Sequence, residues 1–321
     1  MRVLVLGGAG FIGSHVVSEL LKTDVDEVIV FDNFVRSSVS NLELELLDSR
    51  CQIFEFGGDI REIEILNRAM EGIDCVIHLA AMWLLHCKEF PRTAFDVNIQ
   101  GTFNVLEACV RNQVKRLIYS SSASVYGDAV EIPMSENHPF NNRNFYGATK
   151  IAGEAMCRAF FDRYGLDFVG LRYMNVYGPR QDQNAAYTGV IPSLLNSIDR
   201  NENPIVNGDG TQAYDFITAR DVARCNVLAL NSQITDQFYN VGTGVQTTIN
   251  DLCNLILELS NSDLRVSFNP YSPEDSRRLV RNRIGSIDKA ASDLGFTFED
   301  DLRTGLSNLI QWRKRNGNFG G

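Results

Sequence analysis

Tyr146 and Lys150 stand four residues apart in the segment YGATK. The following IAGEAMCRAFFDRYG favours a helix, which would put both side chains on one face. A free tyrosine, with a pKa of about 10, is a poor base at pH 7. A nearby ammonium stabilises the phenolate and lowers that pKa, and Ser122, which ends an apolar run, can polarise the same substrate oxygen. The trio predicts catalytic proton transfer at that oxygen; the alternative is an exposed helical pair.

A glycine-rich turn follows the first apolar run, in GGAGFIGSH. Gly7, Gly10 and Gly13 allow a tight turn, approach of the backbone to a pyrophosphate and close helix–strand packing, and the new helix offers free N–H groups to phosphates. Asp32, nineteen residues after Gly13, can accept hydrogen bonds from a ribose diol and would repel a 2'-phosphate. The pattern predicts NAD(H) rather than NADP(H). Arg36 is the opposing signal, because it could turn toward a phosphate.

Asp59, in the segment GDI, follows a third apolar run. Its carboxylate could accept a hydrogen bond from the adenine amino group. It could also cap the helix expected in REIEILNRAM, or do both.

These residues follow apolar runs that alternate with helix-length segments. The alternation predicts an α/β fold with a Rossmann-like, doubly wound parallel sheet. The expected strands are 3–7, 27–32, 52–59, 75–80, 116–122 and 167–178. We expect a NAD-binding domain over residues 1–178, with returning segments at about 214–242. A smaller, interleaved domain over 179–321 would mainly bind substrate.

The charge and the cysteines limit the class of protein. Among 321 residues, 30 are basic and 40 acidic, a formal net charge of −10 that disfavours nucleic acid and anionic membranes as partners. No apolar stretch is long enough to cross a bilayer, and the first residues lack the features of a signal peptide. The seven scattered cysteines indicate buried thiols in a reducing compartment rather than disulfides or a metal site. We therefore expect a cytoplasmic protein without a metal.

The ordered motifs GGAGFIG, GDI, HLAA, VNIQGT, SSSASVYG, YGATK and RYMNVYGPRQ resemble those of extended short-chain dehydrogenases/reductases. Specifically, the chain resembles nucleotide-diphosphate-sugar (NDP-sugar) 4-epimerases of the UDP-galactose 4-epimerase type. The resemblance implies Ser122, Tyr146 and Lys150 as catalytic residues, the last two also touching the cofactor. It implies further NAD contacts from Gly7, Gly10, Phe11, Ile12, Gly13, Asp32, Asn33, Asp59, Ile60, Leu79, Ala80, Ala81, Asn98 and Tyr173. Ser122 and Asn175 would contact substrate, Asn175 at the diphosphate.

Departures from the family pattern bear on the reaction and the substrate. Dehydratases and decarboxylases of the family carry an acid just after the catalytic strand, where this chain has Ala123 and Ser124. Those reactions are therefore disfavoured. Trp83 stands where epimerases usually have a lysine. Gln212 and Tyr214 stand in the region that commonly supplies an arginine for the diphosphate.

A later R-x-G-D element is also absent, and the region reads SPEDSRRLVRNRIG. We expect its arginines to bind the substrate diphosphate or another acidic group; they are Arg277, Arg278, Arg281 and Arg283. The alternative is a solvated basic face that pairs with Glu274 and Asp275.

The resemblance places Arg283 at a position that lines the sugar pocket. A long cation there would exclude an N-acetyl group or favour an acidic or acceptor-rich sugar. A slip of one residue in the alignment would turn Asn282 or Ile284 inward instead. Asp182 argues against an acidic sugar, because family enzymes for uronic acids tend to carry an arginine there.

The resemblance implies NAD-dependent epimerisation at C4 of an NDP-sugar, expected to be a UDP-sugar, through a transient 4-keto sugar. The alternatives are an NDP-4-keto-sugar reductase and, less favoured, a dehydratase, a decarboxylase or a non-enzymatic NAD-sensing protein. Family members also pair two helices into a four-helix interface. This implies a homodimer through residues 98–112 and 146–164, whose apolar side chains are Phe103, Val105, Leu106, Val110, Ile151, Met156, Phe160 and Phe161.

Overall fold

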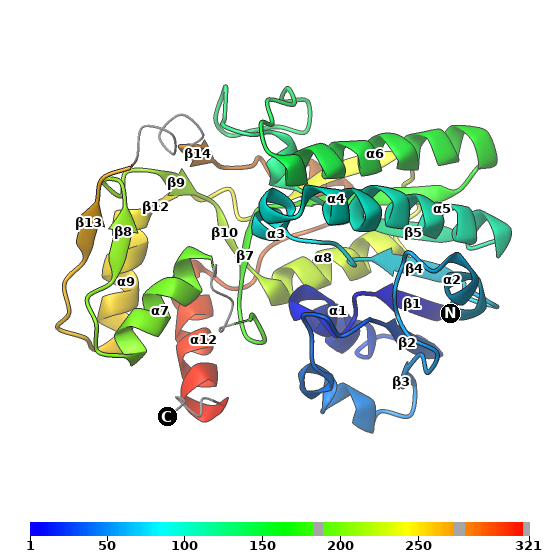
Figure 1. Ribbon diagram of the computed structural model, residues 1–321, viewed down its shortest axis with the longest axis horizontal. Coiled ribbons are helices and arrows are strands. Elements are labelled where there is room, and N and C mark those ends of the chain that lie inside the picture. Colours follow the sequence, from blue (N-terminus) through cyan, green and yellow to red (C-terminus); the bar gives the residue numbers. More distant parts are fainter. Residues whose placement is uncertain (183–188, 272–279, 317–321) are drawn as a thin grey trace.

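The computed structural model describes residues 1–182, 189–271 and 280–316. A seven-stranded parallel sheet forms its centre, in the order β11-β6-β5-β4-β1-β2-β3 (Figure 1). The strands are β1 (Arg2–Leu6), β2 (Glu27–Phe31), β3 (Cys51–Ile53), β4 (Cys75–His78), β5 (Arg116–Ser122), β6 (Asp167–Tyr173) and β11 (Gln237–Val241). The predicted doubly wound α/β fold is confirmed. The strand order reverses between β1 and β4, which is where such sheets open a ligand crevice at their carboxyl edge.

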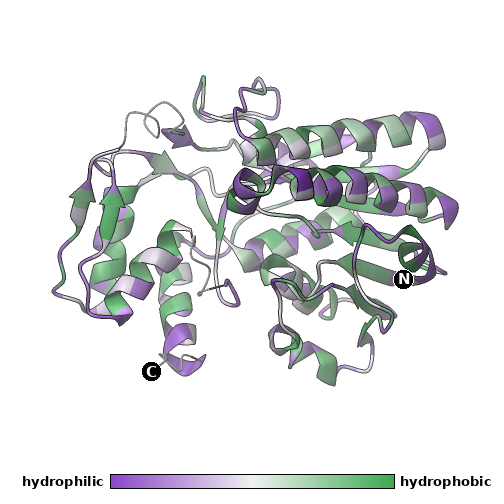
Figure 2. Cartoon of the chain, in the orientation of Figure 1, coloured by the Kyte–Doolittle hydropathy of each residue, from purple (hydrophilic) through white to green (hydrophobic). Residues whose placement is uncertain are grey.

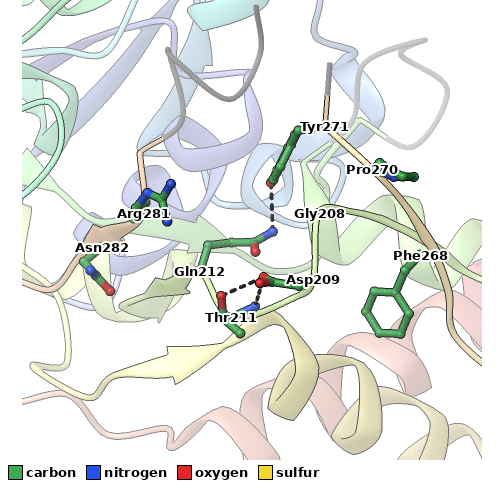
Figure 3. A pocket seen from close by; sticks show the side chains of 9 residues that line it. All are labelled: Gly208, Asp209, Thr211, Gln212, Phe268, Pro270, Tyr271, Arg281 and Asn282. Atoms are coloured by element: carbon green, nitrogen blue, oxygen red, sulfur yellow. Dashed lines mark hydrogen bonds between the residues drawn. The ribbon is translucent and has the colours of Figure 1, made fainter. Parts of the chain in front are cut away.

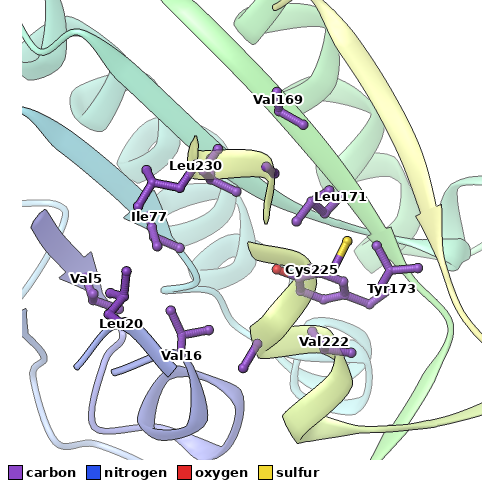
Figure 4. Packing of buried hydrophobic residues seen from close by; sticks show 14 of the residues in the cluster. Val5, Val16, Leu20, Ile77, Val169, Leu171, Tyr173, Val222, Cys225 and Leu230 are labelled. Atoms are coloured by element: carbon purple, nitrogen blue, oxygen red, sulfur yellow. The ribbon is translucent and has the colours of Figure 1, made fainter. Parts of the chain in front are cut away.

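Helices cover both faces of this sheet because its strands are apolar on both sides. In β1, Val3 and Val5 belong to one core cluster and Leu4 and Leu6 to the other. The first face is covered by α1 (Phe11–Leu20), α8 (Ala219–Asn231) and α11 (Asp288–Leu294), and Figure 4 shows α1 and α8 packed there. The second face is covered by α2 (Ile63–Ala69), α5 (Thr102–Arg111) and α6 (Phe145–Tyr164). Figure 2 shows the central strands as predominantly hydrophobic.

The local sequence defines both ends of α6, the helix that holds the predicted catalytic pair. The Asn144 side chain accepts a hydrogen bond from the Gly147 N–H and caps the first turn. Gly165 ends the helix at φ +69°, a conformation that glycine adopts readily. Tyr146 therefore lies in the first turn and Lys150 one turn later.

A smaller lobe has a third apolar core. It is built on the helices α7 (Val190–Asp199), α9 (Ile249–Ser260) and α12 (Leu302–Asn316). Its strands form short sheets, which are β7 (Asn175–Tyr177) with β10 (Phe216–Thr218), β8 (Ile205–Asn207) with β13 (Ser267–Asn269), and β9 (Ala213–Tyr214) between β12 (Thr247–Thr248) and β14 (Asn282–Arg283).

Short helical segments complete the described chain. They are η1 (Val39–Leu42), η2 (Glu45–Leu47), α3 (Leu84–Glu89), α4 (Pro91–Ala94), η3 (Phe95–Gly101) and η4 (Ala123–Val125). All seven cysteines are buried and free. Among the described residues, no helix has the length and apolar character needed to cross a membrane.

Three predicted elements differ from the structure. The strand expected over 167–178 is two strands, because the Met174 N–H still bonds to Val241 while the Asn175 N–H bonds to Asp215 in the smaller lobe. The strand expected over 52–59 ends at Ile53, before Gly57 adopts φ +99°. The helix expected over 98–112 begins inside a π-helical turn, η3, and becomes α-helical at Thr102.

Candidate active site

The glycine turn between β1 and α1 forms a tight backbone cradle. Gly7 has φ +80°, and a Cβ there would lie 2.8 Å from the backbone nitrogen of Ala80. A Cβ on Gly13 would lie 2.1 Å from the Gly7 carbonyl oxygen, so α1 can approach the turn only without a side chain. A Cβ on Gly10 would meet only that carbonyl oxygen, at 3.2 Å, and no side chain caps the first turn of α1. The cradle fits a dinucleotide pyrophosphate, which would bind the free N–H groups.

Asp32 lies directly after β2 at the edge of this cradle. Its Oδ2 accepts a hydrogen bond from the Ala9 N–H (3.0 Å). Its Oδ1 accepts hydrogen bonds from the Phe34 N–H (2.9 Å) and the Ser37 hydroxyl (2.7 Å). The half-buried carboxylate thus holds the loop at the edge of the cradle, at the position predicted for a ribose diol.

Arg36 is engaged within the protein. Its guanidinium lies over the Trp83 ring, 4.5 Å from the ring centre, and 3.4 Å from the Asp182 carboxylate. This contact joins the loops that follow β2 and β4. It restrains Arg36 from turning toward a phosphate and gives Trp83 a role that the lysine usual in epimerases would not have.

Asp59 does not cap α2, which corrects one of its two predicted roles. The N-cap of α2 is Glu62, and the Asp59 carboxylate forms a bidentate pair with Arg61, with distances of 3.0 and 2.6 Å. This pairing holds the pKa of Asp59 below its usual value, and the Asn33 side chain adds to the effect. The other role, at the adenine, stays a prediction.

Asn98 and Ile60 are buried. The Asn98 Oδ1 accepts a hydrogen bond from the Met82 N–H (2.6 Å), while its Nδ2 donates to the Met82 carbonyl (2.9 Å) and to the Thr149 hydroxyl (3.1 Å). Asn98 thereby ties the loop after β4 to α6. Other residues expected near NAD lie after β4 and at the start of α1. Half-buried Leu79 and Ala80 donate backbone hydrogen bonds to the Leu6 carbonyl, and exposed Ala81 follows them. Phe11 and Ile12 are the first two residues of α1.

Ser122, Tyr146 and Lys150 come together at the carboxyl edge of the sheet. The Ser122 hydroxyl, at the end of β5, accepts a hydrogen bond from the Ser124 N–H (3.1 Å) and lies close enough to Tyr146 to lower the pKa of that phenol. The Lys150 ammonium is buried, donates to the Ser120 carbonyl (2.7 Å) and lies 5.8 Å from the Tyr146 ring centre. The backbone carbonyl of Ser120, which no sequence signal identifies, thus positions Lys150.

Burial shifts the pKa values of Tyr146 and Lys150 in opposite directions. Burial raises the pKa of Tyr146 to about 12, while the nearby Ser122 hydroxyl and the positive charge of Arg283 lower it in part. The lowered pKa expected from the spacing of Tyr146 and Lys150 is therefore not found, because desolvation of the phenol outweighs these influences. Burial also lowers the pKa of Lys150 to about 8.

Tyr173 and Asn175 make structural contacts. The buried Tyr173 hydroxyl bonds to the Ser120 hydroxyl (2.9 Å) and donates to the Asn226 side chain (3.0 Å). The Asn175 amide donates to the Asp215 carbonyl (3.1 Å). The predicted roles of Tyr173 near nicotinamide and of Asn175 at the diphosphate stay predictions.

A pocket of about 720 Å³ opens in the smaller lobe (Figure 3). The Gln212 amide donates to the Tyr271 hydroxyl (3.1 Å) across it. Arg281, one of the predicted arginines, lines this pocket, as do Gly208, Asp209, Thr211, Phe268, Pro270 and Asn282. Arg277 and Arg278 lie outside the described residues, as do Glu274 and Asp275. The sequence did not point to Phe268 and Tyr271, because an isolated aromatic residue carries no motif.

The histidines serve structure. His15 contacts the Pro179 carbonyl (3.0 Å), and buried His78 contacts the Thr102 hydroxyl (3.1 Å). Burial lowers the pKa of both, to about 4 and about 3. Within the described part of the chain, no group of histidine, cysteine and acidic side chains could hold a metal ion.

Comparison with known proteins gives matches along the whole chain. The NAD dependent epimerase/dehydratase family model matches residues 3–242. The chain is 34% identical over 319 residues to a putative UDP-glucose 4-epimerase of Methanocaldococcus jannaschii, covering 98% of this chain and 99% of that protein.

Two solved structures have nearly the same fold. One is the UDP-N-acetylglucosamine 4-epimerase from Methanobrevibacter ruminantium in complex with UDP-N-acetylmuramic acid, at TM-score 0.91 and 31% identity over 98% of this chain and 99% of that one. The other is a dTDP-glucose 4,6-dehydratase from Streptomyces venezuelae with NAD and TYD bound, at TM-score 0.90 and 28% identity over 98% of each chain.

The predicted cofactor and the predicted resemblance are both confirmed by these matches. The glycine cradle and Asp32 are the groups of this chain that would hold NAD. The chain belongs to the NAD dependent epimerase/dehydratase family and is similar over its whole length to nucleotide-sugar 4-epimerases.

Proposed function

We propose that this protein is an NDP-sugar 4-epimerase, which inverts C4 of a nucleotide sugar through a transient 4-keto sugar. The observation that carries the proposal is the convergence of Ser122, Tyr146 and Lys150 beside the glycine cradle, at the carboxyl edge of one sheet. The 4-epimerase names of the full-length relatives support it. A UDP-sugar is the expected substrate.

Each residue of the trio has one task in this reaction. Ser122 donates a hydrogen bond to the C4 oxygen, and Tyr146 takes the proton from that oxygen. Lys150, while charged, stabilises the resulting phenolate. When bound, NAD would accept the C4 hydride and return it to the keto sugar, so that no net oxidation would occur. Tyr146 gives the proton back to the C4 oxygen after the sugar has turned.

The pocket in the smaller lobe offers a place for the nucleotide part. Phe268 and Tyr271 supply aromatic surfaces, and Arg281 supplies a positive charge for a phosphate. A nucleotide held there would leave its sugar free to turn about the diphosphate linkage.

A dehydratase is disfavoured by the surroundings of Tyr146. Ala123 and Ser124 are both buried, and neither is an acid. A reductase would use the same trio but consume NAD(P)H in each turnover.

Turnover without added cofactor separates these activities. We expect purified protein, incubated with UDP-galactose, UDP-N-acetylgalactosamine or UDP-uronates, to form the C4 epimer of at least one of them. Formation of a 4-keto-6-deoxy sugar would indicate a dehydratase, and a strict requirement for NAD(P)H would indicate a reductase.

The Tyr146→Phe variant tests the assigned base. It should lower kcat roughly 10²- to 10⁴-fold, because it removes the transferable proton. NAD should still bind, since the ring still packs. Tyr164→Phe, at the exposed end of α6, is the matched control and should retain full activity. Full activity of Tyr146→Phe would refute the mechanism.

A further inference from the structure

The guanidinium of Arg283 lacks a counter-ion within the described part of the protein. Its Nε is fully buried and has no hydrogen-bond partner. Burial lowers the pKa of Arg283, which is the direction expected for a cation removed from water. The side chain as a whole is half-buried. A partly desolvated charge without a partner still costs stability, so proteins rarely keep one without a use.

The nearby carboxylates accept hydrogen bonds from groups other than the Arg283 guanidinium. Asp128 is the acidic residue whose charge acts on Arg283. Its Oδ1 accepts the N–H groups of Arg281 (2.7 Å) and Asn282 (3.1 Å). Asp215, behind β9, accepts hydrogen bonds from the Thr243 N–H, the Thr243 hydroxyl and the Gly244 N–H. These contacts position the strand and leave the guanidinium itself unpaired.

Arg283 lies at the sugar end of the proposed substrate path. Its charge acts on the catalytic Tyr146 and on Tyr214, its direct neighbour across the β9–β14 pair. The two preceding residues, Arg281 and Asn282, line the pocket in the smaller lobe (Figure 3). The strand therefore leads from the pocket proposed for the nucleotide to the tyrosine proposed for C4.

We propose that Arg283 binds a carboxylate carried by the sugar, so that the preferred substrate is an acidic nucleotide sugar. The planar guanidinium matches the two oxygens of a carboxylate. In a chain of net charge −10, such a substrate requires a local cation. Asp182 does not oppose this inference, because its carboxylate lies beside Arg36. The inference rests on the proposed function.

Binding to the NAD-loaded protein tests the inference. Titration calorimetry would compare the binding of UDP, UDP-glucose, UDP-glucuronate and UDP-N-acetylmuramate. The last two carry a carboxylate, at different positions of the sugar. We expect at least one acidic sugar to bind more tightly than UDP-glucose. Arg283→Met should weaken that ligand roughly 10- to 100-fold, the range for a hydrogen bond to a charged group, while UDP binding changes little. Arg283→Lys should retain part of the preference.

The controls separate a binding effect from misfolding. Arg303→Gln removes an exposed arginine that pairs with Glu258 and should leave every affinity unchanged. Arg283→Met should melt at the same temperature as the parent or higher, because an unpaired, half-buried charge is lost.

Three outcomes would overturn the inference. One is an unchanged preference in Arg283→Met. Another is a loss of UDP affinity in Arg283→Met as large as the loss of affinity for the acidic sugar nucleotide, which would place Arg283 at the diphosphate. The third is weaker binding of both acidic sugars than of UDP-glucose in the parent protein. In these cases the epimerase assignment would stand if UDP-glucose is still turned over. Failure to bind or convert any nucleotide sugar would instead refute the proposed function.

Discussion

Lys150 makes the proposed reaction depend on pH. Burial lowers its pKa to about 8, so its positive charge is complete below that pH and is lost as the pH rises through it. In the proposed mechanism this charge stabilises the phenolate of Tyr146, so its loss would weaken the base. We therefore expect kcat/KM to fall above about pH 8, as measured in a pH series. Lys115→Gln, which removes an exposed lysine paired with Asp74, should show the same profile as the parent. A profile that stays flat well above that pH would contradict this role of Lys150.

Asp32 should determine the choice of dinucleotide. Asp32→Ala removes the carboxylate that would accept from the ribose diol and repel a 2'-phosphate. We expect NAD(H) affinity to fall roughly 10- to 100-fold and the preference over NADP(H) to narrow. Ser37→Ala removes only the 2.7 Å hydrogen bond to the carboxylate and should keep the preference. Fluorescence titration of both cofactors measures this, and tighter binding of NADP(H) by the parent protein would refute the assignment.

At the scale of elements, two glycines at the junction of β1 and α1 are predicted to have different roles: Gly13 permits helix packing, and Gly10 permits cofactor binding. A Cβ on Gly13 would meet the Gly7 carbonyl oxygen at 2.1 Å, so Gly13→Ala must push α1 away from the turn. We expect the free energy of unfolding to fall by about 1–3 kcal/mol, as measured by denaturant titration without NAD. Gly10→Ala should fold nearly normally, because its closest contact is 3.2 Å, but should bind NAD more weakly. Equal stability of the two variants would contradict this reading of the cradle.

A buried ion pair between α6 and β6 also positions an element of the site. Glu154 on α6 and Arg172 on β6 form a buried ion pair of 2.7 Å, and the Ser121 hydroxyl donates to the same carboxylate (2.5 Å). The pair fixes the helix over the end of β5. Since α6 carries Tyr146 and Lys150, this buried network positions the proposed catalytic pair relative to Ser122.

For the whole molecule, we predict a homodimer through the outer sides of α5 and α6. Val105, Leu106 and Phe160 are buried in the core and cannot reach a partner, which corrects the sequence-based choice of contacts. Phe103 is 44% exposed, and Phe145 is 42% exposed. Native mass spectrometry should report twice the chain mass of 35.9 kDa.

Charge introduced at this surface tests the interface. Phe103→Glu should shift the mass toward the single chain, because a carboxylate is costly in an apolar interface. Leu47→Glu, at an exposed site on η2, should leave the assembly unchanged. A parent protein that is monomeric at micromolar concentration would contradict the prediction.

Local patterns in the sequence determined the glycine turn, Asp32 and the pairing of Tyr146 with Lys150. Each depends on residues close together in the chain: a turn between strand and helix, or a spacing of one helical turn. The apolar runs likewise determined the parallel sheet, because strands buried on both faces are apolar throughout.

Contacts between distant segments were decided only by the tertiary structure. The chain leaves the large sheet after Met174 because the Asp215 carbonyl accepts the next backbone hydrogen bond, from Asn175. Asn98 holds the loop after β4 by accepting a hydrogen bond from the Met82 N–H. The charge of Arg283 reaches Tyr146 because β14 pairs with β9. No local propensity encodes these partners, since each is chosen by packing across the fold, where burial makes an unpaired polar group costly.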